Sequence, residues 1–280
     1  MKYPEILSIQ PKPSIFAYDA DFTILYALGL GAGAAPDELK FVYEKDLVAL
    51  PTMGVMMGGG SSEFLSGGGI DYSRIVHGEQ RLTIHRPLPP AGRMLSHSRL
   101  LGVVDKGKEK GALLIVESSV EGEGDGVHYA TATSTLFCRG DGGFGGSPEG
   151  ELPLNPIPDR PHDLEAVLPS LPQQAALYRL TGDKNPLHID PERAQSVGFP
   201  GPILHGLCSY GVAARAVLQA CCDNDPARLA QFDVRFSSPV YPGEAITTRI
   251  WRNGAELSFE CVIAERGVTV LRNGYARINP

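Results

Sequence analysis

A carboxylate, a carboxamide and an imidazole lie within one short loop of this 280-residue chain, at Asp183, Asn185 and His188. Gly182 and Pro186 interrupt regular structure around them, because glycine adopts backbone conformations closed to other residues and proline disrupts helices and strand ladders. The side chains of Asp183 and His188 can therefore converge instead of lying along one helix face. An acid, a neutral amide and a base brought together in this way predict proton transfer.

The same residues have structural alternatives. A Gly-Asp-x-Asn-Pro sequence is also typical of an Asx-turn, in which Asp183 would cap the helix expected after Pro191. His205 precedes an expected helix, where a histidine more often packs or hydrogen-bonds than catalyses. We interpret Cys208, inside that helix, as a packing residue. For His77 a strand or interdomain role is the alternative to direct chemistry.

Metal, phosphate and nucleic-acid chemistry have less support. The sequence contains no HExxH motif, no CxxC motif and no spaced carboxylate cluster, which predicts a site without a catalytic metal. The glycine clusters at 58–60 and 67–69 lack the Gly-Lys-Ser/Thr ending of a phosphate-binding loop, so we interpret them as flexible loops. A net charge of -7 argues against a nucleic-acid surface, since polyphosphate binding depends on a basic face.

Cysteine usage and hydropathy predict a cytoplasmic protein. The five cysteines are odd in number, and only Cys221 and Cys222 are near one another, which favours reduced, buried thiols. No run of eighteen apolar residues predicts a membrane span, and the N-terminal residues lack the pattern of an export signal. The C-terminus also lacks a Ser-Lys-Leu peroxisomal address.

A segment rich in glycine and proline, from Gly140 to about Pro161, divides the chain. We expect an N-terminal domain at 1–140, a linker at 141–161 and a C-terminal domain at 162–280. Three matched segments indicate that the two domains repeat one plan. They pair Leu25–Leu28 with Leu177–Leu180, Pro87–Gly92 with Pro239–Gly243, and Val127–Cys138 with Val268–Ile278.

The second half predicts a helix from about Leu204 or His205 to about Ala220. Its surface is small or apolar on most sides, so other elements must surround it. Four segments with strand-like alternation follow it and could wrap it. They are Phe232–Phe236, Glu244–Trp251, Glu256–Ala264 and Val268–Ile278.

The first half has similar strands but no comparable helix between Pro51 and Ser73. Its expected strands are Ser73–His85, Arg93–Val104, Ala112–Val120 and Val127–Cys138. We therefore expect an α+β fold of two antiparallel curved sheets, each wrapping a central helix, with the first helix shortened or missing. The volume left by that helix would hold a bulky apolar ligand, with Met53, Met56 and Met57 as an adaptable lining.

The stretch from Tyr178 to Ala194 resembles the hydratase 2 signature of the MaoC-like dehydratase family, with every characteristic position filled. Tyr18–Gly31, His77–Gln80 and Pro202–Gly206 are similar to segments of the two-domain R-specific 2-enoyl-CoA hydratases. The resemblance implies a double hot-dog fold and a homodimer. It also implies a hydro-lyase of fatty-acid β-oxidation, which reversibly converts a trans-2-enoyl-CoA into a (3R)-3-hydroxyacyl-CoA without a metal or redox cofactor. The expected partner is then an acyl-CoA thioester.

Each task of that reaction has a candidate group. Asp183 and His188 would hold one water and pass its protons, either of them being the base, while Asn185 would orient the water or the substrate. The backbone amide of Gly206, at the start of the buried helix, would stabilise negative charge on the thioester oxygen. Asp190 would fix the imidazole tautomer, although a structural role suits it equally well.

The repeat predicts one catalytic set per chain. Aligning Leu25-Tyr26 with Leu177-Tyr178 without a gap places three residues that cannot titrate opposite Asp183, Asn185 and His188. They are Gly31, Gly33 and Pro36. We expect the first half to shape the acyl pocket and the second half to carry the chemistry.

Three other functions remain open. A hot-dog thioesterase would hydrolyse the same ligand at its thioester carbon, and a non-catalytic module would bind an acyl-CoA without turnover. Within the family, a dehydratase would act on carrier-protein-bound or bulky acyl thioesters. The grouping of Asp183, Asn185 and His188 disfavours the first two.

Overall fold

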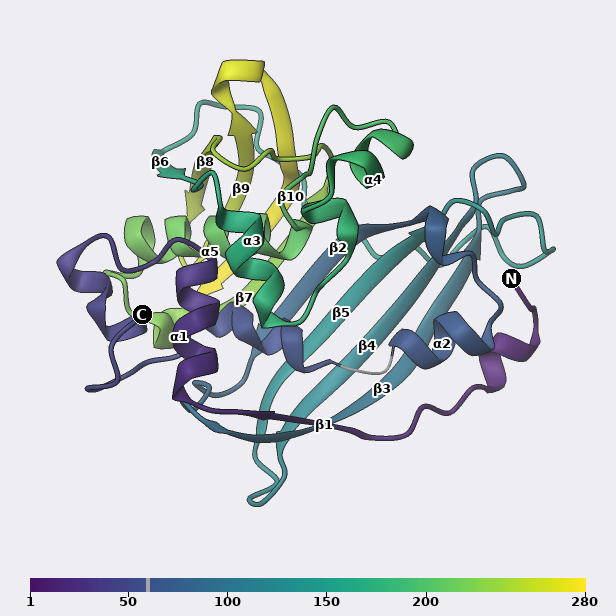
Figure 1. Ribbon diagram of the computed structural model, residues 1–280, viewed down its shortest axis with the longest axis horizontal. Coiled ribbons are helices and arrows are strands. Elements are labelled where there is room, and N and C mark those ends of the chain that lie inside the picture. Colours follow the sequence, from purple (N-terminus) through teal and green to yellow (C-terminus); the bar gives the residue numbers. More distant parts are fainter. Residues whose placement is uncertain (59–60) are drawn as a thin grey trace. The chain divides into compact units, whose positions relative to one another are not determined.

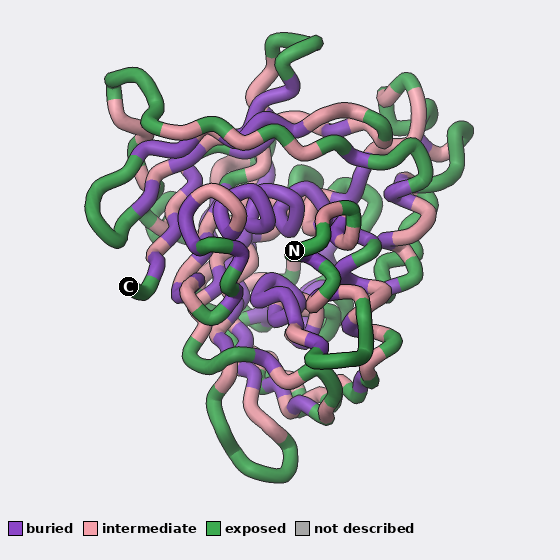
Figure 2. The backbone as a smooth tube through the Cα atoms, turned by 90° about the vertical axis from the view of Figure 1, so that its left-hand side faces the viewer, coloured by how far each residue is buried: buried purple, intermediate pink, exposed green. Residues whose placement is uncertain are grey.

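The fold is taken from a computed structural model that describes residues 1–58 and 61–280. The chain forms two compact units. Unit 1 comprises Met1–Ala17, Gly54–Arg86 and Arg93–Leu154, and unit 2 comprises Tyr18–Met53, Pro87–Gly92 and Asn155–Pro280. Buried residues follow the helices and strands, whereas exposed residues follow the loops (Figure 2). Of the glycine cluster at 58–60, Gly59 and Gly60 lie outside the described residues.

Unit 1 contains five of the ten strands of the sheet, which lie in the order β1-β3-β4-β5-β2 (Figure 1). Its strands are β1 (Ser14–Tyr18), β2 (Ile75–Ile84), β3 (Gly92–Asp105), β4 (Ala112–Gly122) and β5 (His128–Cys138). The pairs β3–β4, β4–β5 and β2–β5 are antiparallel. Buried residues alternate with more exposed ones along β4, as expected for a sheet with one covered face.

The helical cover of unit 1 is short. A 3-10 helix spans Pro51–Met57, and α2 (Ser61–Gly67) crosses in front of β3 and β4 in Figure 1. The prediction of a shortened first helix is therefore confirmed among the described residues. At Gly68, which follows α2, a Cβ atom would lie 2.5 Å from Ile6 Cδ1 and 2.6 Å from the Phe64 carbonyl oxygen. This glycine is thus needed for close packing of the chain behind α2.

Unit 2 contains the other five strands, in the order β7-β10-β9-β8-β6. Its strands are β6 (Leu164–Pro169), β7 (Leu229–Phe236), β8 (Ala245–Asn253), β9 (Glu256–Ile263) and β10 (Val268–Ile278). The pairs β7–β10, β9–β10, β6–β8 and β8–β9 are antiparallel. Four of the five strands match the sequence expectation closely, while β6 was not expected.

The central helix of unit 2 is α5 (Gly206–Cys221), and every residue from Cys208 to Leu218 is buried. It packs against β6, β7 and β8 of the same sheet. Gly211 allows a close approach, because a Cβ atom there would lie 2.6 Å from both methyl groups of Leu30. The structure therefore has the predicted α+β architecture, with one long buried helix and one short helix.

Residues 18–53 belong to unit 2 although they precede the sheet of unit 1 in sequence. They include α1 (Ala20–Gly29), which packs against α3 (Gln174–Tyr178). The side chain of Gln174 donates to the Gly29 carbonyl at 2.8 Å, and Arg215 of α5 donates to the Leu30 carbonyl at 2.6 Å. The compact units thus interleave along the chain, and the domain bounds 1–140 and 162–280 expected from the sequence stay a prediction.

The glycine-rich stretch after β5 is held in unit 1 by a carboxylate. Asp105, at the end of β3, accepts hydrogen bonds from the backbone amides of Gly143 and Gly145 at 2.7 and 2.8 Å. These bonds lower the pKa of the Asp105 carboxyl. The division between the units falls after Leu154, inside the expected linker at 141–161.

Candidate active site

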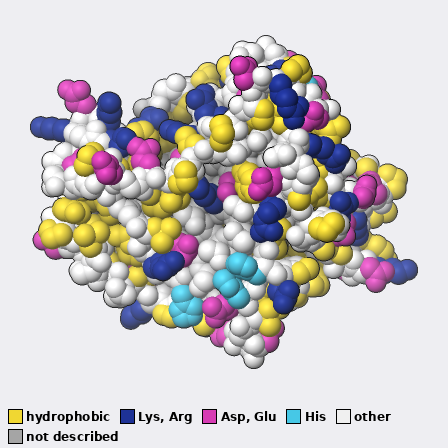
Figure 3. Space-filling view, turned by 180° about the vertical axis from the view of Figure 1, so that it is seen from behind, with side chains coloured by type: hydrophobic (Ala, Val, Ile, Leu, Met, Phe, Trp, Pro, Cys, Tyr) yellow, Lys and Arg dark blue, Asp and Glu magenta, His cyan; other side chains and the backbone are white. Residues whose placement is uncertain are grey.

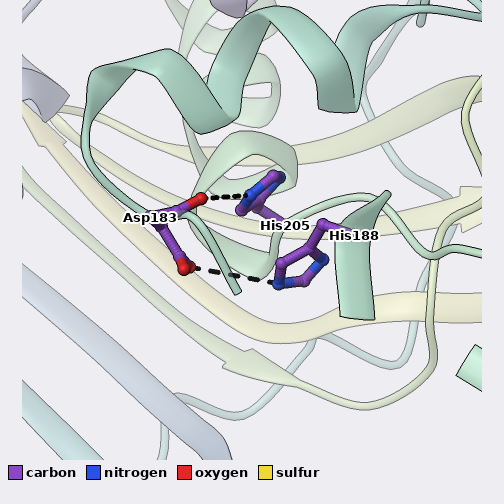
Figure 4. A group of neighbouring side chains, drawn as sticks. All are labelled: Asp183, His188 and His205. Carbon is purple, nitrogen blue, oxygen red and sulfur yellow. Dashed lines mark hydrogen bonds and ion pairs between the residues drawn. The ribbon is translucent and has the colours of Figure 1, made fainter. Parts of the chain in front are cut away.

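The loop that carries Asp183 is shaped by the residues on either side of it. Gly182 has a φ of 135°, a conformation that other residues rarely adopt. The Asp183 Oδ1 atom accepts the amide of Asn185 at 3.1 Å, and a 3-10 helix then begins at Pro186 and ends at His188. This turn brings Asp183 and His188 face to face, as the sequence predicts (Figure 4).

His188 is buried, and one of its two ring nitrogens forms a hydrogen bond that fixes the tautomer. Its Nδ1 atom lies 2.8 Å from the Ile203 carbonyl oxygen, which can only accept, so Nδ1 carries the proton. Nε2 faces Asp183 Oδ2 at 3.9 Å. The Asp183 side chain is 49% exposed, whereas that of His188 is 9% exposed. Burial lowers the pKa of His188, despite the opposing effects of the Ile203 carbonyl and Asp183.

His205 lies against His188 and forms part of the same cluster. The two imidazole rings stack with centroids 3.7 Å apart, and Nε2 of His205 donates to the backbone carbonyl of Asp183 at 3.1 Å (Figure 4). Burial, and then the neighbouring His188, lower the pKa of His205 to about 4. Its Nδ1 atom is buried and has no hydrogen-bond partner within the described ranges. A neutral His205 therefore holds both the Asp183 backbone and the His188 ring.

Two buried tyrosines of unit 2 continue this row of ring contacts in tilted orientations. The ring of Tyr178 lies 5.0 Å from that of His205, and the ring of Tyr26 lies 6.1 Å from that of Tyr178. The Tyr26 hydroxyl donates to Thr52 at 3.0 Å. Burial raises the pKa of both phenols, so they remain protonated. The His205 ring is therefore in contact with Tyr178 as well as with His188.

Asn185 and Asp190 make local backbone contacts. The Asn185 side chain accepts the Leu187 amide at 3.0 Å and so caps the turn that carries His188. Asp190 caps α4 (Pro191–Ser196) by accepting the Glu192 amide at 2.9 Å. The hydrogen bond predicted from Asp190 to the imidazole is wrong in this structure, because the Ile203 carbonyl takes that position.

Gly206 is the first residue of α5, where a backbone N–H group has no acceptor inside its own helix. A Cβ atom at this position would lie 3.3 Å from the Phe236 ring. A larger residue would therefore crowd the start of the helix, next to His205. The Gly206 amide, predicted as the donor to the thioester oxygen, therefore lies next to the stacked rings of His188 and His205.

The three predicted methionines are divided between the units. Met53 is buried in unit 2, where the Thr23 hydroxyl lies 3.8 Å from its sulfur. Met57 is buried and Met56 is half-buried in unit 1. Their predicted role in binding the acyl chain stays a prediction.

Asp183, His188 and His205 each offer one atom suited to a metal ion, and these atoms lie within 4.8 Å of one another. One nitrogen of each imidazole already donates to a backbone carbonyl. The three residues could thus offer one carboxylate oxygen and two remaining nitrogens. A metal-free site, which the sequence predicts, stays a prediction.

Comparison with known proteins assigns both halves of the chain. Residues 154–273 match the model of the MaoC-like domain, and residues 16–140 match that of the MFE-2 hydratase 2 N-terminal domain. The chain is 40% identical to a probable enoyl-CoA hydratase 2 of Dictyostelium discoideum, over 99% of this chain and 96% of that protein. The chain belongs to the MaoC-like dehydratase family. It is accordingly an enzyme of the hydro-lyase class.

Two further relatives support membership of the MaoC-like dehydratases. Enoyl-CoA hydratase ChsH3 of Mycobacterium tuberculosis is 37% identical, over 96% of this chain and 95% of that protein. The crystal structure of a MaoC-like dehydratase from Phytophthora capsici superposes with a TM-score of 0.88 at 35% identity, covering 100% of this chain and 99% of that one. The predicted family and double hot-dog fold are therefore confirmed. Within the described residues, no helix combines the length and apolar character needed to cross a bilayer.

His205 is the member of the cluster that sequence reasoning undervalued. A histidine before a helix has no local pattern that distinguishes packing from function. The informative signal was its place directly before Gly206, the proposed amide donor. Its contact with Asp183 joins residues 22 positions apart, so it depends on the folded chain.

Proposed function

We propose that this chain adds water to trans-2-enoyl-CoA thioesters to give (3R)-3-hydroxyacyl-CoA, and catalyses the reverse dehydration. The observation that carries this proposal is the 3.9 Å separation between Asp183 Oδ2 and His188 Nε2. It is too long for a direct hydrogen bond and suits a water molecule bonded to both atoms. The names of the hydratases from Mycobacterium tuberculosis and Dictyostelium discoideum support the substrate class.

His188 is proposed as the group that takes the proton from this water. Nδ1 of His188 donates its proton to the Ile203 carbonyl, so Nε2 carries a lone pair. The lowered pKa of His188 keeps the ring neutral near pH 7. The water oxygen bonds to C3 as its proton moves to Nε2, and the electrons of the double bond shift toward the thioester. A proton then passes from the Asp183–His188 pair to C2. The pair regains its starting state, and the substrate gains the atoms of one water.

The thioester oxygen carries the negative charge during this step. We assign the Gly206 amide as its donor, because the first turn of α5 presents an N–H group without an intrahelical acceptor. The dipole of this long helix favours an anion at the same end. Removing one such donor lowers turnover by about 10²- to 10³-fold in other enzymes.

The division of labour between the units is part of the proposal. Unit 2 holds the proton-transfer residues, and unit 1 is assigned to the acyl chain. Its short α2 and the methionines of the preceding 3-10 helix, Met56 and Met57, support this assignment. A cofactor-free reaction, a homodimer and a cytoplasmic location are carried forward as predictions.

An absorbance assay on purified protein with crotonyl-CoA and longer trans-2-enoyl-CoAs tests the proposed reaction. Hydration removes the enoyl absorbance without releasing free thiol. Release of CoA thiol would instead indicate a thioesterase. Binding without either signal would indicate an acyl-CoA-binding module and would overturn the proposal.

A further inference from the structure

Unit 2 contains the tripeptide Arg-Asn-Gly twice. We call Arg252–Gly254 the hairpin tripeptide and Arg272–Gly274 the strand tripeptide. In an Asn-Gly sequence the backbone nitrogen of glycine can attack the carboxamide carbon of asparagine, because glycine has no side chain to shield that nitrogen or to restrict rotation around it. The two tripeptides have the same covalent structure, so their surroundings decide which of them reacts.

The hairpin tripeptide lies at the tip of the hairpin formed by β8 and β9. Asn253 pairs with Glu256, which leaves Gly254 and Ala255 as a two-residue turn. Gly254 has a φ of 63°, as expected for glycine at the first position of a type II′ turn. Every residue from Arg252 to Glu256 is exposed, and a Cβ atom on Gly254 would meet no other atom within 4 Å. Among the described residues, none forms a hydrogen bond with the Asn253 carboxamide.

The strand tripeptide is held inside the sheet. The Asn273 side chain donates to the Asn155 carbonyl at 2.8 Å, and the Asn155 side chain donates to the Gly274 carbonyl at 2.8 Å. Gly274 is buried and pairs with Phe259 of β9, whose carbonyl oxygen would lie 2.5 Å from a Cβ atom at Gly274. A ring closed between Asn273 and Gly274 would break these contacts. The fold therefore protects the strand tripeptide and leaves the hairpin tripeptide unprotected.

We propose that Asn253 is a modification site, at which the chain deamidates and forms isoaspartate without an enzyme. The Gly254 nitrogen bonds to the Asn253 Cγ atom and the Cγ–Nδ2 bond breaks, while the proton of the Gly254 amide passes through solvent to the departing ammonia. Water then opens the resulting cyclic imide. Attack of water at Cγ gives aspartate, whereas attack at the main-chain carbonyl carbon gives isoaspartate, in which the backbone runs through the former side chain.

Isoaspartate at this position disturbs the hairpin, because it adds one methylene group to the main chain. The length of the turn fixes the register of β8 against β9. Trp251 and Leu257, on either side of the turn, are buried, and the Ala255 carbonyl accepts the Ile278 amide of β10 at 2.9 Å. A longer backbone cannot keep the turn and these contacts together, so the modified protein is less stable.

Peptide mapping of the full-length protein tests this assignment. The protein is incubated at physiological temperature and mildly alkaline pH, then digested in heavy-oxygen water, which labels any deamidation that occurs during digestion. Mass spectrometry should detect conversion at Asn253 first. Conversion at Asn273 should be slower by at least about 10-fold, because its hydrogen bond and the surrounding strands must open. No conversion of Asn253 in the folded protein, or a rate no greater than that at Asn273, would overturn the proposal.

In urea the two tripeptides should react at similar rates, because only the fold distinguishes them. A difference in urea as large as that in the folded protein would show that the local sequence, and not the hairpin, makes Asn253 reactive. That result would also contradict the proposal.

Asn253→Gln is the matched variant. It keeps the carboxamide on a side chain one methylene longer, which disfavours closure of the imide ring. Isoaspartate, measured with a methyltransferase that esterifies isoaspartyl carboxylates, should accumulate in the parent protein and be lost in the variant. The melting temperature should fall on ageing in the parent alone. Equal accumulation in both proteins would place the reaction at another residue and refute the assignment, whichever reaction the enzyme catalyses.

Discussion

At the scale of single residues, the site contains two imidazoles, His188 and His205, that make different contacts with Asp183. His188 directs a free Nε2 atom at the space beside Asp183, whereas His205 uses Nε2 to hold the Asp183 backbone. One ring is thereby available to a water molecule, and the other fixes the geometry.

Removing either side chain that contacts the water should stop catalysis without unfolding the protein. Asp183→Asn and His188→Gln should each lower kcat for enoyl-CoA hydration by about 10²- to 10⁴-fold, because general acid–base catalysis is lost. Both variants should keep the circular dichroism spectrum of the parent protein. Ser196→Ala, an exposed substitution on α4, serves as a control that should keep full activity. Near-normal turnover in both site variants would contradict the assignment.

The histidine pair should make the fold sensitive to acid. Both pKa values are lower in the native chain than the unperturbed value of about 6.5, and that of His205 is about 4. The unfolded chain therefore binds more protons between about pH 6.5 and pH 4, so the free energy of unfolding falls as pH decreases through that window. Above about pH 6.5 both histidines are neutral in either state, and this contribution disappears.

Urea titrations at a series of pH values measure this effect. His205→Phe keeps a ring on His188 but cannot titrate, so its stability should decline less steeply between about pH 6.5 and pH 4. The difference attributable to His205 should be on the order of 3 kcal/mol. Parallel curves for the two proteins would show that His205 does not carry the acid sensitivity.

Asp190 should affect stability more than catalysis. Its carboxylate caps α4, and loss of an N-cap residue costs about 1 kcal/mol. Asp190→Ala should lower the free energy of unfolding by that amount, with kcat changed less than about 3-fold, whereas Asp190→Ser should recover most of the stability. A hundredfold loss of kcat in Asp190→Ala at full occupancy would restore a role in orienting the imidazole.

Local spacing was sufficient to find Asp183, Asn185 and His188, because Gly182 and Pro186 act on their immediate neighbours. The tautomer of His188 could not be predicted in the same way. Its partner is the carbonyl of Ile203, 15 residues away, so the relevant bond forms only after α4 and the following loop have folded. Asp190 was nearer in sequence, but its side chain is used by the first turn of α4.

At the scale of elements, a buried ion pair fastens residues 18–53 to the central helix of unit 2. Arg215 of α5 hydrogen-bonds Glu38, and both side chains are at most 5% exposed. Glu38 also accepts the Gly33 amide at 3.0 Å, and Gln219 donates to it at 3.0 Å. The Glu38 carboxylate therefore accepts hydrogen bonds from both the loop after α1 and the helix α5.

Breaking this ion pair on one side should be costly. Arg215→Met leaves the Glu38 carboxylate buried without its cation, and such a change costs about 3 to 5 kcal/mol. Chemical denaturation measures the loss. The double variant Arg215→Met with Glu38→Gln removes the uncompensated charge and should regain part of it. If the single and double variants were equally unstable, the loss would come from packing and not from the unpaired charge.

The strands were more predictable than the helical elements. Buried residues alternate with more exposed ones along much of β4 and β10, which is typical of a strand with one buried face. The predicted bounds of both strands agree closely with the structure. The placement of α1 depends on other information, since its C-terminal carbonyl groups bond to Gln174 and Arg215 from distant parts of the chain. Neither this helix nor its partners were predicted from the sequence.

At the scale of the whole molecule, the two halves of the chain repeat one plan. The loop proposed for proton transfer lies in the second half. Opposite Asp183 the first copy has Gly31, which adopts a φ of 76°. A Cβ atom there would lie 3.4 Å from Arg215 Nη1, so the position is occupied by a structural contact within unit 2. Gly31 therefore has a structural role, and one catalytic set per chain stays a prediction.

The surface is consistent with a small-molecule thioester as the partner. Basic and acidic side chains are interspersed over the face shown in Figure 3, and the net charge is -7. A polyphosphate chain would need a continuous basic field instead. The proposed acyl-CoA ligand requires only local contacts.

Chirality of the hydration product tests the central claim most directly. Crotonyl-CoA and a longer trans-2-enoyl-CoA would be incubated with the protein, and the 3-hydroxyacyl products would be resolved on a chiral column. In the proposed reaction, one Asp183–His188 pair beside one amide donor would deliver water to a single face of C3, so the product would have one configuration. We expect a product that is only 3R; a 3S product, or a racemic one, would rule out the proposed reaction.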